Sequence, residues 1–172
     1  PEINFTISAL KDKKEHLISN ITFYEGTIGN HKVIVSLSGI GKVNSAINTT
    51  LLINNFKPDV IINSGIAGGS KELSTFDFVI ADKLTYSDFD CQVFNYEFGQ
   101  VPQMPLYYFS DSNLKEKLEA YLTSKNISFK NSIVLTADSF RLSASEIKNN
   151  VSDFLMKETK RRPMILPIIL DV

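Results

Sequence analysis

The sequence predicts an α/β protein built on one mixed, twisted sheet that is flanked by helices. Two mainly apolar segments, 33–37 and 60–63, each begin with three consecutive Val or Ile residues rather than alternating, which is typical of strands covered on both faces. Small residues follow each run at once: Ser38-Gly39-Ile40-Gly41 and Ser64-Gly65-Ile66-Ala67-Gly68-Gly69. Helical and strand patterns then succeed one another without repeats, as in α/β proteins.

The first 55 residues predict five elements. Alternation favours a strand at 3–9, and the polar stretch 11–18 fits a first helix. Two further strands, at 21–27 and 31–37, are separated by Gly29-Asn30 and form a hairpin. A helical pattern follows at 43–55.

The second half predicts a strand at 77–84 and a long irregular stretch at 87–111 that is rich in aromatic residues. Loops of this length in compact domains are usually lids, binding loops or interfaces. The remaining expected elements are an amphipathic helix at 112–124, a strand at 132–136, a short helix at 144–151 and a buried strand at 164–170.

Length and composition predict one ordinary globular domain. The chain has 172 residues, 43% of them hydrophobic and 22% charged, with a net charge of −1. This balance shows no preference for nucleic acid or a membrane as a partner. Cys91 is the only cysteine, so neither a disulfide framework nor a cysteine-based metal site is expected.

The N-terminus lacks a basic-then-apolar signal pattern, and no apolar run has transmembrane length. A cytoplasmic protein is therefore expected. Because the sequence starts at Pro1 without Met, a processed leader stays open.

The small residues after the apolar runs predict a ligand site made of main chain. Glycine lets backbone approach a ligand closely, because no Cβ is in the way. In open α/β sheets, ligands bind outside the carboxyl ends of the strands. Two neighbouring strands therefore point at one pocket.

Three segments in the same order resemble the 5′-methylthioadenosine/S-adenosylhomocysteine nucleosidases. They are Ser38-Gly39-Ile40-Gly41-Lys42, the stretch 57–69, and Phe94-Asn95-Tyr96-Glu97-Phe98-Gly99-Gln100-Val101-Pro102, within a likeness that runs from about Val33 to Arg141. The resemblance implies a nucleoside phosphorylase fold, a homodimer and hydrolysis of the N-glycosidic bond of a purine nucleoside with release of adenine. It implies no cofactor and no metal.

By the same resemblance, Asp171 is the acid that protonates adenine, and its alternative role is a strand-end cap or turn residue. The Ser and Arg that accompany this Asp in the family are here Leu170 and Pro167. Phosphorylases bind phosphate early in the chain through a Gly-Asp and Arg signature. The corresponding place, 9–13, reads Ala-Leu-Lys-Asp-Lys, so water is the expected nucleophile.

Two lysines stand where the family has glutamates. Lys13 aligns with the base that activates water, and Lys157 with the Glu that follows Met156 in the ribose-binding pair; a one-residue slip would instead bring in Glu158. A cationic Lys neither accepts a proton from water at neutral pH nor favours a ribosyl cation. Hence the alternative function is a catalytically impaired nucleoside-binding or interaction protein on the same scaffold.

The resemblance also assigns binding residues. Phe140 stacks on adenine while the main chain at Arg141 reads the base edge, and the alternative for Phe140 is an ordinary core residue. A lid reaches in from a neighbouring subunit, or else is an aromatic cluster within one subunit: Phe94, Tyr96 and Pro102. The other expected substrate-binding residues are Leu10, Ile40, Ile66, Ala67, Gly68, Met156 and Lys157. Relative to the family, the expected single domain 1–172 is shortened near 17–22 and 154–164, either by true deletions or because pieces are absent from the given sequence.

Overall fold

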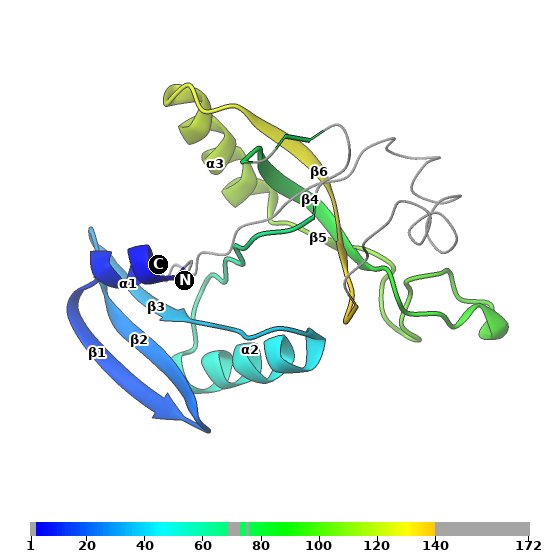
Figure 1. Ribbon diagram of the computed structural model, residues 1–172, viewed down its shortest axis with the longest axis horizontal. Helices are drawn as coiled ribbons and strands as arrows, with labels where there is room; N and C mark the ends of the chain where they lie inside the picture. Colours follow the sequence, from blue (N-terminus) through cyan, green and yellow to red (C-terminus); the bar gives the residue numbers. More distant parts are fainter. Residues whose placement is uncertain (1–2, 69–72, 75, 140–172) are drawn as a thin grey trace. The chain divides into compact units, whose positions relative to one another are not determined.

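The computed structural model describes residues 3–68, 73–74 and 76–139 (Figure 1). Their contacts divide the chain into two compact units, one with the described residues up to Gly65 and one with those from Ile66 onward. Each unit has a three-stranded sheet of its own. Strands and helices in this mixture confirm the α/β class, whereas the single domain stays a prediction.

The first unit contains an antiparallel sheet in the order β1-β2-β3. Its strands are β1 (Lys11–Ile18), β2 (Ile21–Ile28) and β3 (His31–Ser36). The turn between β2 and β3 contains Gly29 with φ +61°, a left-handed conformation that glycine adopts without a steric penalty. The hairpin expected from Gly29-Asn30 is confirmed.

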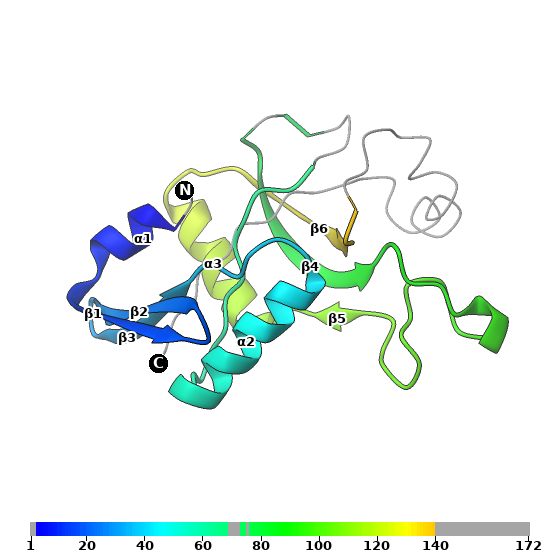
Figure 2. The ribbon, with the colours of Figure 1, turned by 60° about the horizontal axis from the view of Figure 1, so that its bottom comes forward.

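Both faces of β3 are buried, as its continuous apolar run predicts. Val33 and Val35 pack in one cluster with Ile7 of α1 (Asn4–Ala9). Ile34 packs in the other cluster with Leu52 of α2 (Lys42–Phe56). Successive side chains of a strand point to opposite faces, so the two helices cover opposite sides of the sheet (Figure 2).

The N-terminal elements are the reverse of the expected ones. Residues 3–9, expected as a strand, contain helix α1, and 11–18, expected as a helix, form β1. Ile3, Ile7 and Leu10 recur at helical spacing and pack together on one cluster. The charged stretch gains backbone hydrogen bonds to β2 and forms an edge strand, where charged side chains reach water. Tertiary pairing thus overrides local preference here.

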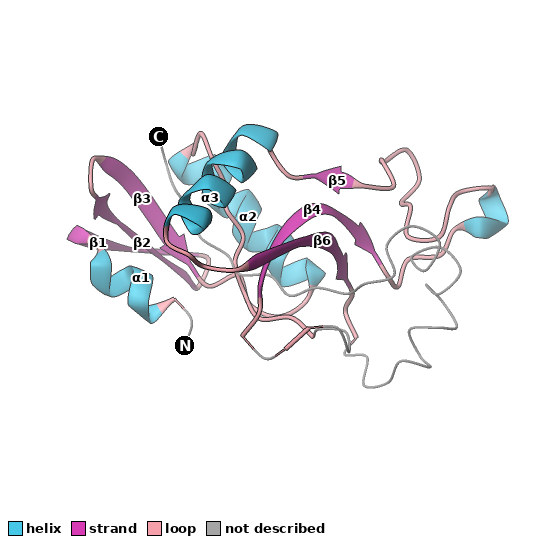
Figure 3. Cartoon of the chain, turned by 90° about the horizontal axis from the view of Figure 1, so that it is seen from above, coloured by secondary structure: helices cyan, strands magenta, loops and turns pink. Residues whose placement is uncertain are grey.

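The second unit contains a mixed sheet in the order β5-β4-β6 (Figure 3). Its elements are β4 (Phe78–Tyr86), the short helix η1 (Gln92–Phe94), β5 (Tyr108–Phe109), α3 (Ser112–Ser124) and β6 (Phe129–Thr136). β4 is antiparallel to β5 and parallel to β6. The strands expected at 77–84 and 132–136 and the helix at 112–124 are confirmed.

Helix α3 is held at its start and against β4. Asp111 caps it by accepting a hydrogen bond from the Leu114 N–H, at 2.9 Å. Lys115 forms an ion pair with Asp82 of β4 and lies 3.4 Å from Glu119. Asp82, and then Glu119, raises the pKa of Lys115. The ammonium therefore stays charged and links the helix to the strand.

The expected strand at 60–63 is absent from the structure. A strand needs a partner for its backbone N–H and C=O groups, and no ladder in the described part of the chain includes these residues. The elements expected at 144–151 and 164–170 lie outside the described residues. Among the residues described, no helix is both long and apolar enough to cross a bilayer.

Phe23 should contribute strongly to the stability of the first unit. It is fully buried between β2 and α2, with its ring 5.4 Å from that of Phe56. We expect Phe23→Ala to lower the free energy of unfolding by about 3–5 kcal/mol in urea titrations followed by circular dichroism. The control is Phe5→Ala, because Phe5 is 83% exposed. Equal effects of the two substitutions would contradict this core.

Three charged or ionisable side chains, here called the clamp, join the strands of the first sheet and predict that its stability depends on pH. Glu25 of β2 accepts hydrogen bonds from Lys32 of β3, at 2.9 Å, and His16 of β1, at 2.7 Å. Lys32, helped by His16, lowers the pKa of Glu25 from its ordinary value of 4.5. Because the folded-state pKa is lowered, the clamp stabilises the protein above about pH 4.5 and is lost as the pH falls through the folded value.

We therefore expect Glu25→Gln to lower the free energy of unfolding by about 0.5–1 kcal/mol at pH 7. The difference from the unmodified chain should shrink progressively below about pH 4. Urea titrations across pH 3–7 measure both effects. Glu116→Gln, at an exposed position of α3, is the control. A difference that is independent of pH would contradict the clamp.

Candidate functional site

The parallel pairing of β4 and β6 creates an edge where two loops begin together. Tyr86 and Thr136 are opposite each other at the ends of the two strands. The Ser87 N–H extends the ladder by donating to the Thr136 carbonyl at 2.9 Å. Beyond it, the Asp88 carboxylate accepts a hydrogen bond from the Asp138 N–H at 2.8 Å. This is the carboxyl edge of the pair, where α/β proteins bind ligands.

The hydrogen bond between Asp88 and Asp138 fixes the backbone two residues before Phe140. The expected adenine-binding, ribose-binding and catalytic residues themselves lie outside the described part of the chain: Phe140, Arg141, Met156, Lys157 and Asp171. Their roles stay predictions. What the structure establishes is that the loop leading toward 140 starts beside the loop after β4.

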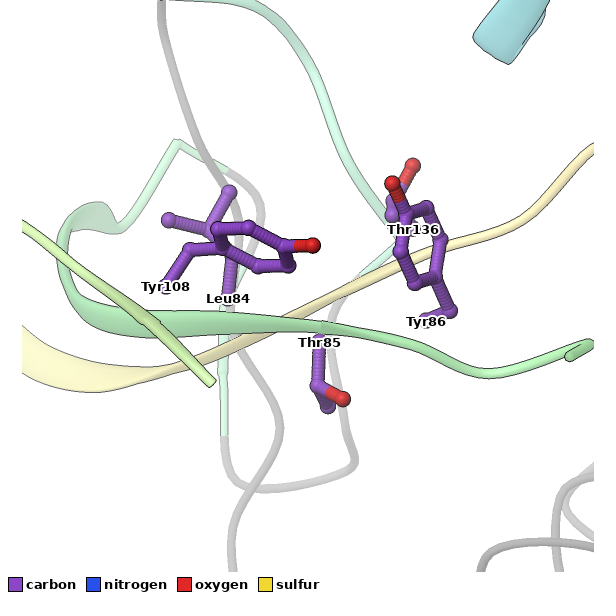
Figure 4. A pocket seen from close by; sticks show the side chains of 5 residues that line it. All are labelled: Leu84, Thr85, Tyr86, Tyr108 and Thr136. Atoms are coloured by element: carbon purple, nitrogen blue, oxygen red, sulfur yellow. The ribbon is translucent and has the colours of Figure 1, made fainter. Parts of the chain in front are cut away.

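A hollow of about 190 Å³ lies at the same end of the strands (Figure 4). It is lined by Leu84, Thr85, Tyr86, Tyr108 and Thr136. Figure 4 shows Leu84 and Tyr86 on one side of β4 with Tyr108 and Thr136, whereas the Thr85 side chain points to the other side. The rings of Tyr86 and Tyr108 meet edge to face, with centroids 6.2 Å apart. Burial, and then the neighbouring Tyr86, raises the pKa of Tyr108, so the phenol stays neutral.

This hollow was not predicted from the sequence. The alternation of Leu84 and Tyr86 was a usable signal, because residues two apart share a face of a strand. The contribution of Tyr108 depends on the antiparallel pairing of β5 with β4, which joins residues far apart in the sequence.

Between β4 and β5 the chain forms an extended arm, residues 87–107, which runs away from the sheet (Figure 1). Gly99 attaches the arm to β4. Its φ is +88°, and a Cβ at this position would lie 2.5 Å from the Tyr86 carbonyl oxygen and 3.0 Å from Thr85 Oγ1. The Gly99 N–H also donates to the Phe89 carbonyl at 2.9 Å. Glycine is therefore required here for both conformation and space.

The three expected lid residues all lie on this arm. Phe94 ends η1 and is 69% exposed, and in the described part of the chain its ring contacts no other aromatic ring. Tyr96 and Pro102 are half-buried. An exposed aromatic side chain on a projecting arm is suited to contact a partner or ligand.

In the first unit, a buried asparagine organises the Gly-rich turn after β3. Asn48 of α2 is 3% exposed. Its amide donates to the Leu37 carbonyl at 3.2 Å and accepts from the Ser36 hydroxyl at 2.9 Å. Gly39 and Gly41, with φ of +78° and +95°, then lead the chain into α2. Ile40 between them is 79% exposed, so its side chain is accessible to solvent at this turn.

The role of Asn48 was not predicted from the sequence either. An Asn within an amphipathic helix is a weak signal on its own, and only the packing of α2 on the sheet shows that it is buried. The substitution Asn48→Leu should leave the Ser36 hydroxyl and the Leu37 carbonyl without these bonds.

The remaining expected site residues differ in exposure. Leu10 is 9% exposed and packs with Val33 and Val35. Ile66 is 73% exposed, and a Cβ on Gly68 would meet nothing within 4 Å. Ala67 between them is half-buried. Their contact with a substrate stays a prediction.

Lys13 lies in β1 rather than on the expected helix. Its ammonium is 3.3 Å from the Glu15 carboxylate and 5.6 Å from the centre of the Tyr24 ring. Within the described ranges, no three His, Cys, Asp or Glu side chains are grouped so that they could hold a metal ion.

Comparison with known proteins supports a common origin over most of the chain. The family model described as the phosphorylase superfamily matches residues 6–160. The 5′-methylthioadenosine/S-adenosylhomocysteine nucleosidase of Staphylococcus carnosus is 40% identical over 161 residues, which are 91% of this chain and 71% of the relative. The nucleosidase of the same name from Staphylococcus aureus strain JH9 is 41% identical over 140 residues, 81% of this chain.

The chain spans 61% of the length of the Staphylococcus aureus relative. Among solved structures, the S-adenosylhomocysteine nucleosidase of Streptococcus pyogenes in complex with 5-methylthiotubericidin has a TM-score of 0.83 and 29% identity. The match covers 98% of this chain and 69% of that one. This likeness confirms the type of fold that the sequence resemblance implies.

The hydrogen bonds of Asn48 predict a measurable stabilisation. We expect Asn48→Leu to lower the free energy of unfolding by about 1–3 kcal/mol, because the Ser36 hydroxyl and the Leu37 carbonyl lose two partly buried hydrogen bonds. Adding Ser36→Ala should recover part of this loss, since one of the unpaired groups is then removed. Asn54→Leu, at an exposed position of α2, is the control. If Asn48→Leu and Asn54→Leu change the free energy of unfolding equally in urea titrations, the proposed role of Asn48 is wrong.

Proposed function

The chain belongs to the phosphorylase superfamily, and we propose that it hydrolyses the N-glycosidic bond of 5′-methylthioadenosine and S-adenosylhomocysteine, releasing adenine. The two staphylococcal relatives carry the name of this activity. The observation that carries the proposal is the carboxyl edge of β4 and β6. There the loop leading toward 140 starts beside the loop after β4.

The proposed chemistry has three requirements: protonation of the leaving adenine, stabilisation of the ribosyl cation, and activation of the attacking water. Asp171 protonates the leaving adenine, and Phe140 stacks on the base while the main chain at Arg141 reads its edge. The developing ribosyl cation needs a negative environment, and the attacking water needs a base. The proposed reaction uses no metal or cofactor.

In this proposal, Lys13 and Lys157 weaken the stabilisation of the ribosyl cation and the activation of water. The resemblance assigns glutamates to both positions, and a general base contributes roughly 10²–10⁴-fold to a rate. Lys13 interacts with the carboxylate of Glu15, and its own group is cationic. We therefore propose an enzyme of low activity, in which the group that activates water differs from that of the family.

The proposed substrate site also includes a second copy of the chain. In this proposal the arm of one copy brings Phe94, Tyr96 and Pro102 over the 5′ substituent bound by the other. The exposed Phe94 ring supports such a contact. Leu10, Ile40, Ile66, Ala67, Gly68 and Met156 are proposed as the remaining walls, and the cytoplasm is the proposed location.

A second candidate function is nucleoside binding without turnover. The lysines at both glutamate positions favour it, because they remove charge needed for the reaction and leave the main-chain parts of the site in place. It predicts affinity for adenine and 5′-methylthioadenosine.

Adenine release distinguishes the two candidates. The purified chain is incubated with 5′-methylthioadenosine, and adenine is separated and quantified by chromatography. We expect release above a buffer blank and a loss of roughly 10²–10⁴-fold in Asp171→Asn, because the general acid is removed.

Calorimetry with adenine and 5′-methylthioadenosine completes the test. Binding without release would support the second candidate and overturn the first. Neither binding nor release would overturn both.

A further inference from the structure

The side chain of Gln100 joins two turns of the arm formed by residues 87–107. In the first turn, the Gln100 N–H donates to the Glu97 carbonyl at 3.0 Å, and the Glu97 N–H donates back to Gln100 Oε1 at 3.3 Å. In the second turn, the Met104 N–H donates to the Val101 carbonyl at 2.9 Å. Gln100 Nε2 reaches across to donate to the Met104 carbonyl at 3.0 Å.

This bridge uses the two different ends of a primary amide. The oxygen accepts from one turn, and the nitrogen donates to the other. A carboxylate has no donor and an ammonium has no acceptor, so neither reproduces both bonds. Gln100 as a residue is half-buried, whereas its two side-chain bonds lie at the exposed surface of the arm.

The bridge lies between the fixed base of the arm and the expected lid. Gly99, the preceding residue, is buried against the end of β4. Tyr96 directly precedes Glu97 at one end of the bridge, and Pro102 lies within the turn from Val101 to Met104 at the other end. The amide therefore sets the spacing between the backbone segments that carry these two side chains.

We propose that Gln100 is a positioning residue that holds Tyr96 and Pro102 in the arrangement in which the arm covers the 5′ substituent of a bound nucleoside. This inference rests on the proposed nucleosidase function. Gln100 acts through the backbone of the arm and does not itself contact substrate. Its loss should weaken the binding of the 5′ substituent more than it slows bond cleavage.

The test compares Gln100→Met with Gln92→Met in the full chain. Met has a similar length and lacks both hydrogen-bonding groups. Gln92, at the exposed start of η1, is the matched control. For Gln100→Met we expect KM for 5′-methylthioadenosine to rise about tenfold with kcat within about twofold, because binding shared by ground and transition states is lost. The control should leave both constants unchanged.

A second substrate separates positioning of the lid from general damage. For 5′-deoxyadenosine, which lacks the alkylthio group, KM should rise less than about threefold in Gln100→Met. Equal rises for the two substrates, or no rise for either, would overturn the role of Gln100 in positioning the lid.

Amide hydrogen exchange provides a readout that does not depend on activity. Residues 96–104 should exchange faster in Gln100→Met than in the unmodified chain or in Gln92→Met. Unchanged exchange would overturn the bridge even in an active enzyme. Faster exchange in a chain that releases no adenine would retain the bridge and overturn the proposed function, and with it the role of the lid.

Discussion

The candidate site depends on the parallel pairing of β4 with β6. Parallel strands end at the same edge of a sheet, so the residues that follow them must leave side by side. Here the edge is extended by the bond from Ser87 to Thr136 and closed by the bond from Asp138 to Asp88. Side chains far apart in the sequence can then serve one ligand. Two antiparallel neighbours would send these loops to opposite ends of the sheet.

The parts of the proposed site that have a clear structural basis are mostly made of main chain. The turn after β3 is organised by Asn48, and the arm is attached to β4 through Gly99. Main-chain groups keep their chemistry when neighbouring side chains change. Such a scaffold can therefore preserve the shape of a nucleoside pocket while Lys13 and Lys157 replace the glutamates implied by the family resemblance. In the proposed function, the shape of the pocket and its catalytic power are therefore separable.

The arm shows how a long loop can hold a defined structure without regular secondary structure. Its base needs glycine because a Cβ would collide with the Tyr86 carbonyl. Farther out, one glutamine amide provides both a donor and an acceptor to the two turns beside Tyr96 and Pro102. Long loops that carry function commonly need such internal bonds, because few side chains pack against them. The conformation of the arm thus depends on hydrogen bonds within it, whereas its attachment to the sheet depends on the contact of Gly99 with β4.

The sequence by itself determined the α/β class, the hairpin of β2 and β3, and helices α2 and α3, because apolar periodicity and turn residues are local signals. It also indicated the family through three short segments. Only the tertiary structure decided that 3–9 contain a helix and that 11–18 form a strand, since packing against β3 and hydrogen bonds to β2 outweigh local preference. Tertiary contacts likewise account for the burial of Asn48, the hollow beside Tyr108 and the bridge of Gln100. Each depends on partners that the chain brings together only by folding.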